Sequence, residues 1–536
     1  MSKEQLELRR KSEDMVVIEF AYDEMKKLIG LPKEKMVEIL SELGAPSEYE
    51  TETNKIITEL TPNRPDWYSM EGLARSLRAY TKKQQTRYKV KKSNYKVIVD
   101  KSVSRPYTVC AVVKGMAFDD QRIRDMILLQ EKLMGTLGRK VKKFGLGIYP
   151  MHNITFPIRY TTLKPREINY RPLGHDNVMG ADQILEEHKK GQQYGHLIKG
   201  QDRYPVFLDS SGKVMCLIPI VNSAETGKVD ETTTEIFIEV TGTEINACKA
   251  ALNILVCTFA DMGGAVYEVS MDYGKEKFNS PDLTPKIMKI GSGDVNKILG
   301  SNFNDKELGG LLQKMGYVYT KGKVEIPPYR ADIMGVVDVV EDVAIAYGYN
   351  NFKPTLPDFF SVGMVKKEYV QIDEIMKGMG FIETKTFILT NKEKLLGDVD
   401  VVEITNPSTV DFTVVRPNLV LDMVQTFAIN KMRGLPQKFY EIGLVHNKGQ
   451  DRKRLVFGIM DKMLDFALVR GYLQTLMAEQ GLVFELKKQE TQVFDSQISS
   501  SVFVNGRSIG IFGKVKKQML EKFGLEFDVY LVELEL

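Results

Sequence analysis

Apolar residues recur along the chain in patterns that predict a series of separate domains. Residues 16–20 alternate apolar and polar side chains as a half-buried strand does, and residues 25–29 carry apolar side chains at helical spacing. A turn ends at Asp66, which suits a helix cap, and residues 67–77 again show helical spacing. Residues 1–85 therefore predict a small α+β domain.

The rest of the chain predicts three more domains. Residues 86–268 mix strand patterns at 144–148 and 237–240 with helical patterns near 121–137 and 246–262, which predicts a large α+β domain. Residues 269–352 predict a compact, mainly helical unit, and residues 353–536 predict a mixed or antiparallel sheet with helices. The patterns behind these last two are helical near 294–299 and 306–315, and strand-rich at 383–389, 439–445 and 502–512.

Composition places the chain among soluble globular proteins. Apolar residues make up 43% of its 536 residues and charged residues 27%, which excludes a disordered, collagen-like or membrane-embedded chain. No apolar run is long enough to cross a bilayer, and the charged residues 1–14 do not resemble a secretory signal. The four cysteines lie far apart without a CxxC pair, which favours reduced thiols in the cytoplasm over disulfides or zinc.

Charge is nearly balanced, so any contact with a polyanion must be local. Lysine and arginine number 74 against 71 acidic residues. Residues 81–99 contain many basic residues, two tyrosines and no acid, and we interpret them as a linker. Such a run is either a solvated connector or a contact for a phosphate backbone. Together with Arg139, Lys140, Lys142 and Lys143 it leaves open that the chain is an RNA-binding module without enzymatic role.

The sharpest candidate for chemistry is an acidic helix near residue 340. Asp338, Glu341 and Asp342 are spaced i, i+3 and i+4, so they share one side of a helix that Asp332 would cap and Gly348 would end. Like charges at this spacing repel by a few tenths of a kcal/mol per pair, so an arginine, helix polarity or a hard cation must compensate. The pattern fits a Mg²⁺ or Ca²⁺ site, a solvated helix start, or a metal hydrolase that uses the helix directly.

A second candidate is a polar pocket beside a strand. Walker, HExxH, GxSxG and GxGxxG motifs do not occur in a convincing context. Alternation over residues 236–243 places Phe237, Glu239 and Thr241 on one face of a strand, which could bind a substrate hydroxyl. The same pattern is equally typical of an exposed polar face.

The stretch PPYRADIMGVVDVVEDVAIAYGYNNF (residues 327–352) resembles the core of the B5 domain in the β subunit of phenylalanyl-tRNA synthetase, of the archaeal and eukaryotic cytosolic type. Further segments agree with this family in the same order, so the resemblance spans essentially the whole chain. They are TPNRPDWYSMEGLARSLRAY (61–80), LQEKLMGTLGRKVKKFGLGI (129–148), EIFIEVTGT (235–243), KFYEIGLV (438–445) and IGIFGKVKKQMLEKFGL (509–525).

The resemblance implies a multidomain α+β fold. Its parts would be an N-terminal α+β domain (1–85), a B3/B4-type editing domain (86–268), a helical B5 domain (269–352) and a catalytically silent, class II synthetase-like domain with an antiparallel sheet (353–536).

The resemblance also implies a partner and a reaction. The β chain would join an α subunit as an (αβ)2 tetramer that attaches phenylalanine to tRNA(Phe) with ATP. ATP and phenylalanine would bind mainly to α, so this chain would carry no catalytic residue for aminoacylation. A Mg²⁺ site shared with α corresponds to Asp332, Asp338, Glu341 and Asp342.

The resemblance further implies editing, the hydrolysis of tyrosine mischarged onto tRNA(Phe). Editing is useful because an apolar pocket rejects an analogue with one added hydroxyl by only about 10²-fold. The editing pocket would comprise Phe207, Cys216, Asn222, Glu239 and Thr241, with Glu239 and Thr241 binding the tyrosyl hydroxyl.

The pocket departs from the family pattern at several positions. Related chains have serine, proline, aspartate and leucine where this chain has Cys216, Ile218, Glu239 and Phe207. GIYPMHNI (147–154) stands where they have a sequence like GIHDLDKI. The longer acid and the bulkier Phe207 are expected to shrink the pocket.

Overall fold

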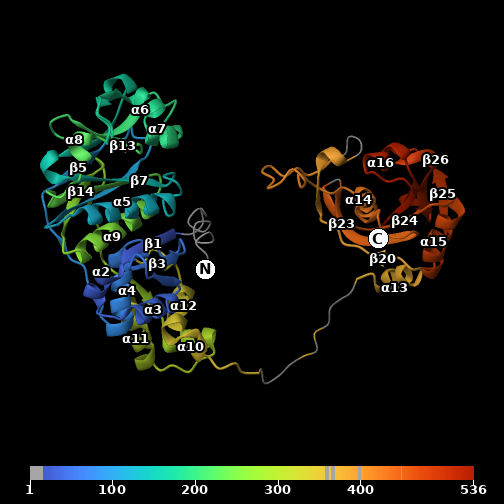
Figure 1. The fold of residues 1–536 in the computed structure, drawn as a ribbon, viewed down its shortest axis with the longest axis horizontal. Helices are drawn as coiled ribbons and strands as arrows, with labels where there is room; N and C mark the ends of the chain where they lie inside the picture. The colour runs from blue at the N-terminus through green and yellow to red at the C-terminus, as the bar shows by residue number, and fades with distance from the viewer. Residues whose placement is uncertain (1–15, 357–360, 362, 364–367, 396–399, 448) are drawn as a thin grey trace. The chain divides into compact units, whose positions relative to one another are not determined.

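The chain divides into two compact units, unit 1 (Met1–Leu356) and unit 2 (Pro357–Leu536), in a computed structural model (Figure 1). The structure describes residues 16–356, 361, 363, 368–395, 400–447 and 449–536. The charged residues 1–14, to which the prediction about a secretory signal applies, lie outside this part. Among the described residues, no helix combines the length and the apolar character that a membrane span requires.

The first segment of unit 1 is an α+β layer, as its pattern predicts. The helix α4 begins at Ser69, whose hydroxyl accepts a hydrogen bond from the Gly72 backbone N–H at 3.2 Å. The prediction of Asp66 as the cap is wrong, because this buried carboxylate pairs with Arg64 at 2.9 Å instead. The antiparallel sheet has the order β1-β3-β2, and its elements are β1 (Val16–Ala21), α2 (Tyr22–Ile29), α3 (Lys33–Glu42), β2 (Ser47–Glu50), β3 (Lys55–Leu60), η1 (Pro65–Trp67) and α4 (Met70–Lys82).

An 11-stranded sheet forms the centre of unit 1, with the order β13-β12-β11-β8-β5-β15-β6-β14-β7 and with β4 and β16 paired to β15. Its strands are β4 (Val90–Lys91), β5 (Lys96–Val99), β6 (Tyr107–Lys114), β7 (Phe144–Pro150), β8 (Ile158–Leu163), β11 (Tyr204–Leu208), β12 (Val214–Leu217), β13 (Val221–Asn222), β14 (Glu235–Gly242), β15 (Ala265–Asp272) and β16 (Lys277–Ser280). Around it lie α5 (Asp120–Gly135), η2 (Met151–Asn153), η3 (Pro165–Glu167), the pair β9 (Asn169–Tyr170) and β10 (Met179–Gly180), α6 (Ala181–Glu187), α7 (Lys189–Tyr194), η4 (Gly195–Leu197), α8 (Ala224–Gly227) and α9 (Ile245–Asp261).

The two faces of this sheet have different neighbours. Alternate residues of β6 and β14, such as Val109 and Ile238, pack with α5 and α9, which lie between the sheet and β1 and β3 (Figure 1). The other residues of the same strands, such as Val112 and Phe237, face a separate apolar cluster on the inner face.

The predicted linker at residues 81–99 is wrong in its second half, because β4 and β5 lie within it and pair with β15 in parallel. Val97 and Val99 of β5 alternate with Lys96 and Ile98, and these valines are buried in the inner-face cluster.

The third segment of unit 1 combines helices with a small sheet that the helical pattern did not reveal. Its strands are only three or four residues long and form the order β17-β19-β18. The helix α12 ends at Gly348, as predicted, where a φ of 93° favours glycine. The elements are β17 (Lys286–Lys289), α10 (Ser292–Leu299), α11 (Asp305–Lys314), β18 (Val318–Thr320), β19 (Lys323–Ile326), α12 (Val336–Tyr347) and η5 (Tyr349–Asn351).

One buried ion pair ties the three segments of unit 1 together. Arg75 on α4 contacts Asp261 on α9 at 2.6 Å, and its guanidinium lies 3.8 Å from the ring centroid of Tyr329. Tyr88 donates a hydrogen bond to Asp261 at 3.0 Å. Apolar residues of all three segments also share one cluster, so unit 1 has a common core.

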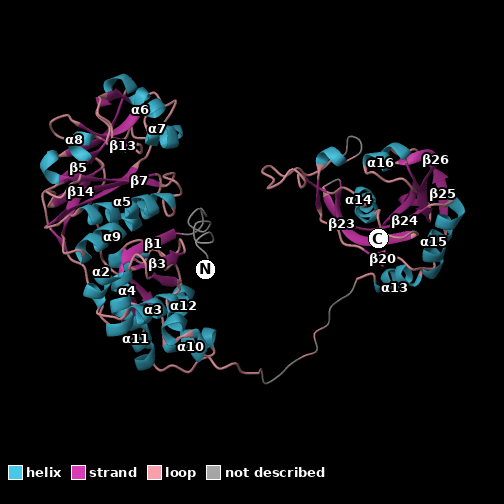
Figure 2. Cartoon of the chain, viewed as in Figure 1, coloured by secondary structure: helices cyan, strands magenta, loops and turns pink. Residues whose placement is uncertain are grey.

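Unit 2 is a three-layer arrangement around a seven-stranded sheet (Figure 2). The sheet is antiparallel except for the parallel pair β20–β23, in agreement with the predicted mixed sheet. The predicted strand at 383–389 is wrong in its middle. Only its two ends lie in strands, one in β20 and the other in β21. The elements are α13 (Val370–Gly378), β20 (Ile382–Glu383), β21 (Leu389–Thr390), η6 (Lys392–Lys394), β22 (Val414–Val415), α14 (Val420–Asn430), β23 (Gln437–Asn447), β24 (Gln450–Asp461), α15 (Phe466–Glu479), β25 (Phe484–Lys488), β26 (Phe494–Val504), β27 (Arg507–Val515), α16 (Lys517–Lys522) and β28 (Asp528–Glu535).

Candidate functional site

Asp338 caps the acidic helix α12 from within its first turn. Its Oδ2 accepts hydrogen bonds from the backbone N–H groups of Met334 and Gly335, both at 2.7 Å. Gly335 precedes the helix and has no side chain for capping, so Asp338 takes that role. The prediction that Asp332 caps the helix is therefore wrong. The polarity of the helix start compensates the charge of Asp338.

Arg330 neutralises two other acidic residues of the predicted set. Its Nη2 lies 2.7 Å from Oδ2 of Asp332 and 2.7 Å from Oδ2 of Asp342. Tyr317 donates a further hydrogen bond to Asp342, and all of these groups lie largely out of solvent. Burial alone would raise the pKa of Asp332, but the adjacent guanidinium outweighs burial and lowers it. Both carboxylates thus share one arginine as their ion-pair partner.

The four acidic residues therefore take different positions in the structure. Glu341 is exposed, Asp338 is half-buried, and Asp342 is turned into the core. In the part of the chain that the structure describes, no three Asp, Glu, His or Cys side chains are arranged to hold a metal ion. Asp338 and Glu341 nevertheless offer hard oxygen donors one turn apart, and Mg²⁺ usually takes only one or two carboxylates from a protein. This donor set fits part of a site, and the predicted magnesium site stays a prediction.

The predicted polar face of β14 lies inside unit 1 and is not exposed. Strand register pairs Glu239 with Gly147 on β7 and with Cys110 on β6. Glu239 is 2% exposed and Thr241 is fully buried. Thr241 donates to Oε2 of Glu239 at 2.5 Å. Burial raises the pKa of Glu239 to about 8, so this carboxyl is largely protonated at neutral pH.

Tyr149, which the sequence analysis did not select, reaches the same group of residues. Its hydroxyl donates to Oδ1 of Asn222 at 3.0 Å. The same hydroxyl lies near Glu239 across Gly147 and opposes the rise in the pKa of that carboxyl. Since Asn222 is on β13 and Tyr149 is on β7, this bond joins the two end strands of the sheet path. Burial raises the pKa of Tyr149 well above its usual value, so the phenol stays protonated.

A cavity of about 70 Å³ borders this group. Cys216, Asn222 and Glu239 line it, while Thr241 is connected to it through Glu239. Phe207 is the register partner of Cys216 on β12 and stacks on Tyr160 with ring centroids 4.8 Å apart. Burial raises the pKa of the Cys216 thiol well above its usual value, so it is not a nucleophilic thiolate. Three of the five predicted residues thus line a cavity that is small beside the 300–1,000 Å³ typical of ligand pockets, while Thr241 and Phe207 do not line it.

A signal for Tyr149 was present in the sequence. Gly145, Gly147 and Tyr149 alternate along β7, so two positions without side chains share a face with one large ring. Because a glycine leaves space on that face of the strand, the ring of Tyr149 can extend over Gly147. The partner on β13 could not be read from the sequence, because Asn222 is 73 residues away.

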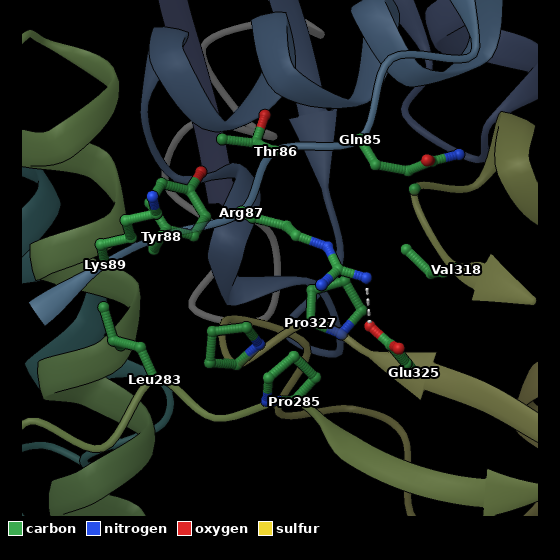
Figure 3. Close-up of a pocket in the computed structure, with 12 residues that line it drawn as sticks. Gln85, Thr86, Arg87, Tyr88, Lys89, Leu283, Pro285, Val318, Glu325 and Pro327 are labelled. Atoms are coloured by element: carbon green, nitrogen blue, oxygen red, sulfur yellow. Dashed lines mark hydrogen bonds and ion pairs between the residues drawn. The ribbon is translucent and has the colours of Figure 1, made fainter.

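A second cavity of about 260 Å³ lies where residues 85–89 meet β18 and β19 (Figure 3). Arg87 extends across it to Glu325, with Nη2 and Oε2 2.9 Å apart. Leu283, Pro285 and Pro327 supply apolar walls. Arg87 of the basic run thus has an acidic partner within unit 1, although its side chain stays 66% exposed.

Unit 2 contains a buried charge network that the sequence analysis also missed. Arg416 is 2% exposed and its guanidinium lies 2.9 Å from Glu441 and 3.1 Å from Asp422. Burial raises the pKa of Asp422 to about 7, although Arg416 opposes this shift. Every partner of this network lies within unit 2, so it is a structural element of that unit.

Comparison with known proteins gives consistent matches along the chain. Residues 363–536 match the phenylalanyl tRNA synthetase beta chain CLM domain, and residues 288–349 match the tRNA synthetase B5 domain. The chain is 34% identical to the phenylalanine–tRNA ligase beta subunit of Archaeoglobus fulgidus over 97% of this chain and 98% of that protein. It is 35% identical to the corresponding subunit of Pyrococcus horikoshii over 88% of this chain and 89% of the other.

A solved structure resembles part of this chain. An N-terminal fragment of the phenylalanyl-tRNA synthetase beta subunit from Pyrococcus horikoshii superposes with a TM-score of 0.59 and 35% identity. It covers 62% of this chain and 99% of the fragment.

Proposed function

The chain belongs to the family of phenylalanine–tRNA ligase β subunits, and from this membership we propose that it is the β chain of a ligase that joins phenylalanine to its tRNA. The observation that carries the proposal is the match to the Archaeoglobus fulgidus subunit over nearly the full length of both chains. The match includes both the B5 and the CLM regions, so it does not rest on a single shared domain.

The proposed division of labour follows the family. An α subunit would bind ATP and phenylalanine and carry the aminoacylation chemistry, and the two chains would assemble as (αβ)2 in the cytoplasm. This chain would supply assembly and tRNA contact through its editing-type, B5 and class II synthetase-like domains. The editing reaction at Phe207, Cys216, Asn222, Glu239 and Thr241 stays a prediction.

The proposed magnesium site would use the exposed side of α12. Of the four predicted ligands, Asp338 and Glu341 would hold the ion, because Asp332 and Asp342 already pair with Arg330. A bound Mg²⁺ would supply positive charge shared with ligands of the α chain. Because two carboxylates do not complete its coordination, the remaining ligands would come from α and from water.

The test is aminoacylation by the purified chain with and without its α partner. We expect phenylalanyl-tRNA only when α, phenylalanine, ATP and Mg²⁺ are all present. Amino-acid activation by the β chain alone would contradict the proposal. Binding of many RNAs with a steep salt dependence and no requirement for α would favour the RNA-binding alternative.

A second measurement separates the magnesium site from general charge effects. Glu341→Gln is expected to raise the Mg²⁺ concentration required for half-maximal charging by the αβ complex. Glu186→Gln, which removes an equally exposed carboxylate on α6, is the matched control and should leave it unchanged. Equal Mg²⁺ requirements in both variants would contradict the assignment of Glu341.

A further inference from the structure

The inner face of unit 1 contains the features of a phenol-binding site. Glu239, Thr241 and Asn222 place a carboxyl, a hydroxyl and an amide together, and all three belong to elements that surround an apolar cluster with Phe237 and Phe207. A few convergent polar groups among aromatic side chains suit a ligand with an apolar ring and one polar end.

The site already holds a phenol from the chain itself. The Tyr149 hydroxyl donates a hydrogen bond to Asn222, and it lies on the same side of Gly147 as Oε1 of Glu239. The Tyr149 ring lies 6.0 Å from the ring of Phe237, its register partner on β14. Tyr149 is fully buried. The Tyr149 side chain therefore reaches the polar groups from inside the fold and is not in contact with solvent.

Gly147 allows this arrangement. Strand alternation puts residue 147 on the face that carries Tyr149, and residue 147 is opposite Glu239 in the register. A Cβ at this position would lie 2.6 Å from the Tyr149 hydroxyl and 2.8 Å from Oε1 of Glu239. The space between the tyrosine and the carboxyl is open only because residue 147 has no side chain.

The remaining space is too small for a second ring. The cavity that borders Cys216, Asn222 and Glu239 measures about 70 Å³, far below the usual size of a ligand pocket. We propose that Tyr149 is a built-in occupant of this phenol-binding site and that it excludes tyrosyl side chains presented from outside. The inference argues against the editing prediction, and it is independent of the charging reaction assigned to the αβ complex.

The direct test removes the Tyr149 side chain and adds a small phenol that could take its place. Tyr149→Ala in the full chain is expected to bind p-cresol, with a Kd at least tenfold lower than that for toluene, because only p-cresol restores the hydroxyl. Wild-type protein should bind neither probe at the same concentrations. An apolar cavity left by a large-to-small substitution readily takes small aromatic molecules, so the comparison of the two probes isolates the polar groups.

Phe237→Ala is the matched control. Phe237 lies on the same inner face and is equally buried, but it carries no hydroxyl. This variant should bind toluene at least as well as p-cresol. The proposal is overturned if wild-type protein binds p-cresol as tightly as Tyr149→Ala does, or if folded Tyr149→Ala shows no preference for p-cresol.

A second variant keeps the test decisive if Tyr149→Ala does not fold. Tyr149→Phe retains the ring and removes the hydroxyl that favours the charged form of Glu239. The pKa of Glu239 in the folded state should therefore be higher in this variant. As a result, the pH-dependent fall in the stability of unit 1 should continue to a higher pH than in the wild type. An unchanged pH profile would show that the hydroxyl does not engage Glu239.

The consequence for tRNA is tested on the αβ complex. Wild-type complex should release tyrosine from mischarged tRNA(Phe) no faster than buffer does. The inference would be overturned if the wild-type complex hydrolysed mischarged tRNA faster than buffer does and if Glu239→Gln abolished this hydrolysis. Charging with phenylalanine by the same preparation reports the proposed function separately, so failure of one is distinguishable from failure of the other.

Discussion

Asp342→Asn tests whether the acidic residues of α12 have two distinct roles. The substitution leaves Arg330 with one carboxylate in place of two and Tyr317 without a charged acceptor. Breaking a buried ion pair costs about 3–5 kcal/mol, and Asp332 retains part of the interaction with Arg330. We therefore expect the free energy of unfolding of unit 1 to fall by about 2–4 kcal/mol. Glu341→Gln alters an exposed residue and should change it by less than about 0.5 kcal/mol.

The single tryptophan makes this measurement specific to unit 1. Trp67 is buried in the same apolar cluster as residues of α12, and the chain has no other tryptophan. Its fluorescence during urea denaturation therefore follows unit 1 without a signal from unit 2. With an m-value of about 3 kcal/mol per molar urea, a loss of about 3 kcal/mol moves the midpoint by about 1 M.

Two results would refute this reasoning. An Asp342→Asn midpoint equal to that of the wild type would mean that the buried pair contributes nothing to unit 1. A Glu341→Gln midpoint lowered as far as that of Asp342→Asn would mean that the exposed carboxylate is also part of the structural network.

Three further predictions follow from the buried polar groups and the inner face. The pKa of Glu239 is raised from about 4.5 to about 8, so the folded state holds the proton longer: stability is full below pH 4.5 and is lost as pH rises through 8. Glu239→Gln should flatten the dependence of the unit 1 midpoint on pH in this window, and an unchanged slope would contradict the burial argument. Arg416→Met leaves two buried carboxylates unpaired and should lower the stability of unit 2 by about 3–5 kcal/mol; far-UV circular dichroism should show this loss while tryptophan fluorescence keeps its midpoint. Gly147→Ala should cost about 1–3 kcal/mol through its contact with the nearby hydroxyl, whereas Gly293→Ala, which meets nothing within 4 Å, should not destabilise unit 1.

The longer elements could be predicted from the sequence because their patterns persist over several turns or strand residues. The predicted helices near 121–137 and 246–262 correspond to α5 and α9 within two residues. The sheet of β17, β18 and β19 was missed because three or four residues are too few to establish an alternation. The linker interpretation was wrong because it was based on the lysine content of residues 81–99. The buried valines Val97 and Val99 instead place residues 96–99 in a strand.

For the candidate site, the sequence could predict only contacts between residues of the same helix or strand. The shared face of Glu239 and Thr241 follows from strand alternation and is confirmed by their hydrogen bond. Their burial depends on β7 and β6, which flank them on both sides. The inward position of Asp342 likewise depends on Arg330, which precedes the helix and reaches back to it. Such pairings are set by tertiary packing, which no local pattern encodes.

The occupied phenol site has a genetic consequence. The codons of tyrosine and histidine differ only in their first base. A single transition in codon 149 would therefore replace the internal phenol with an imidazole. The state of this pocket can thus change in one mutational step, without an intermediate that loses the aromatic ring.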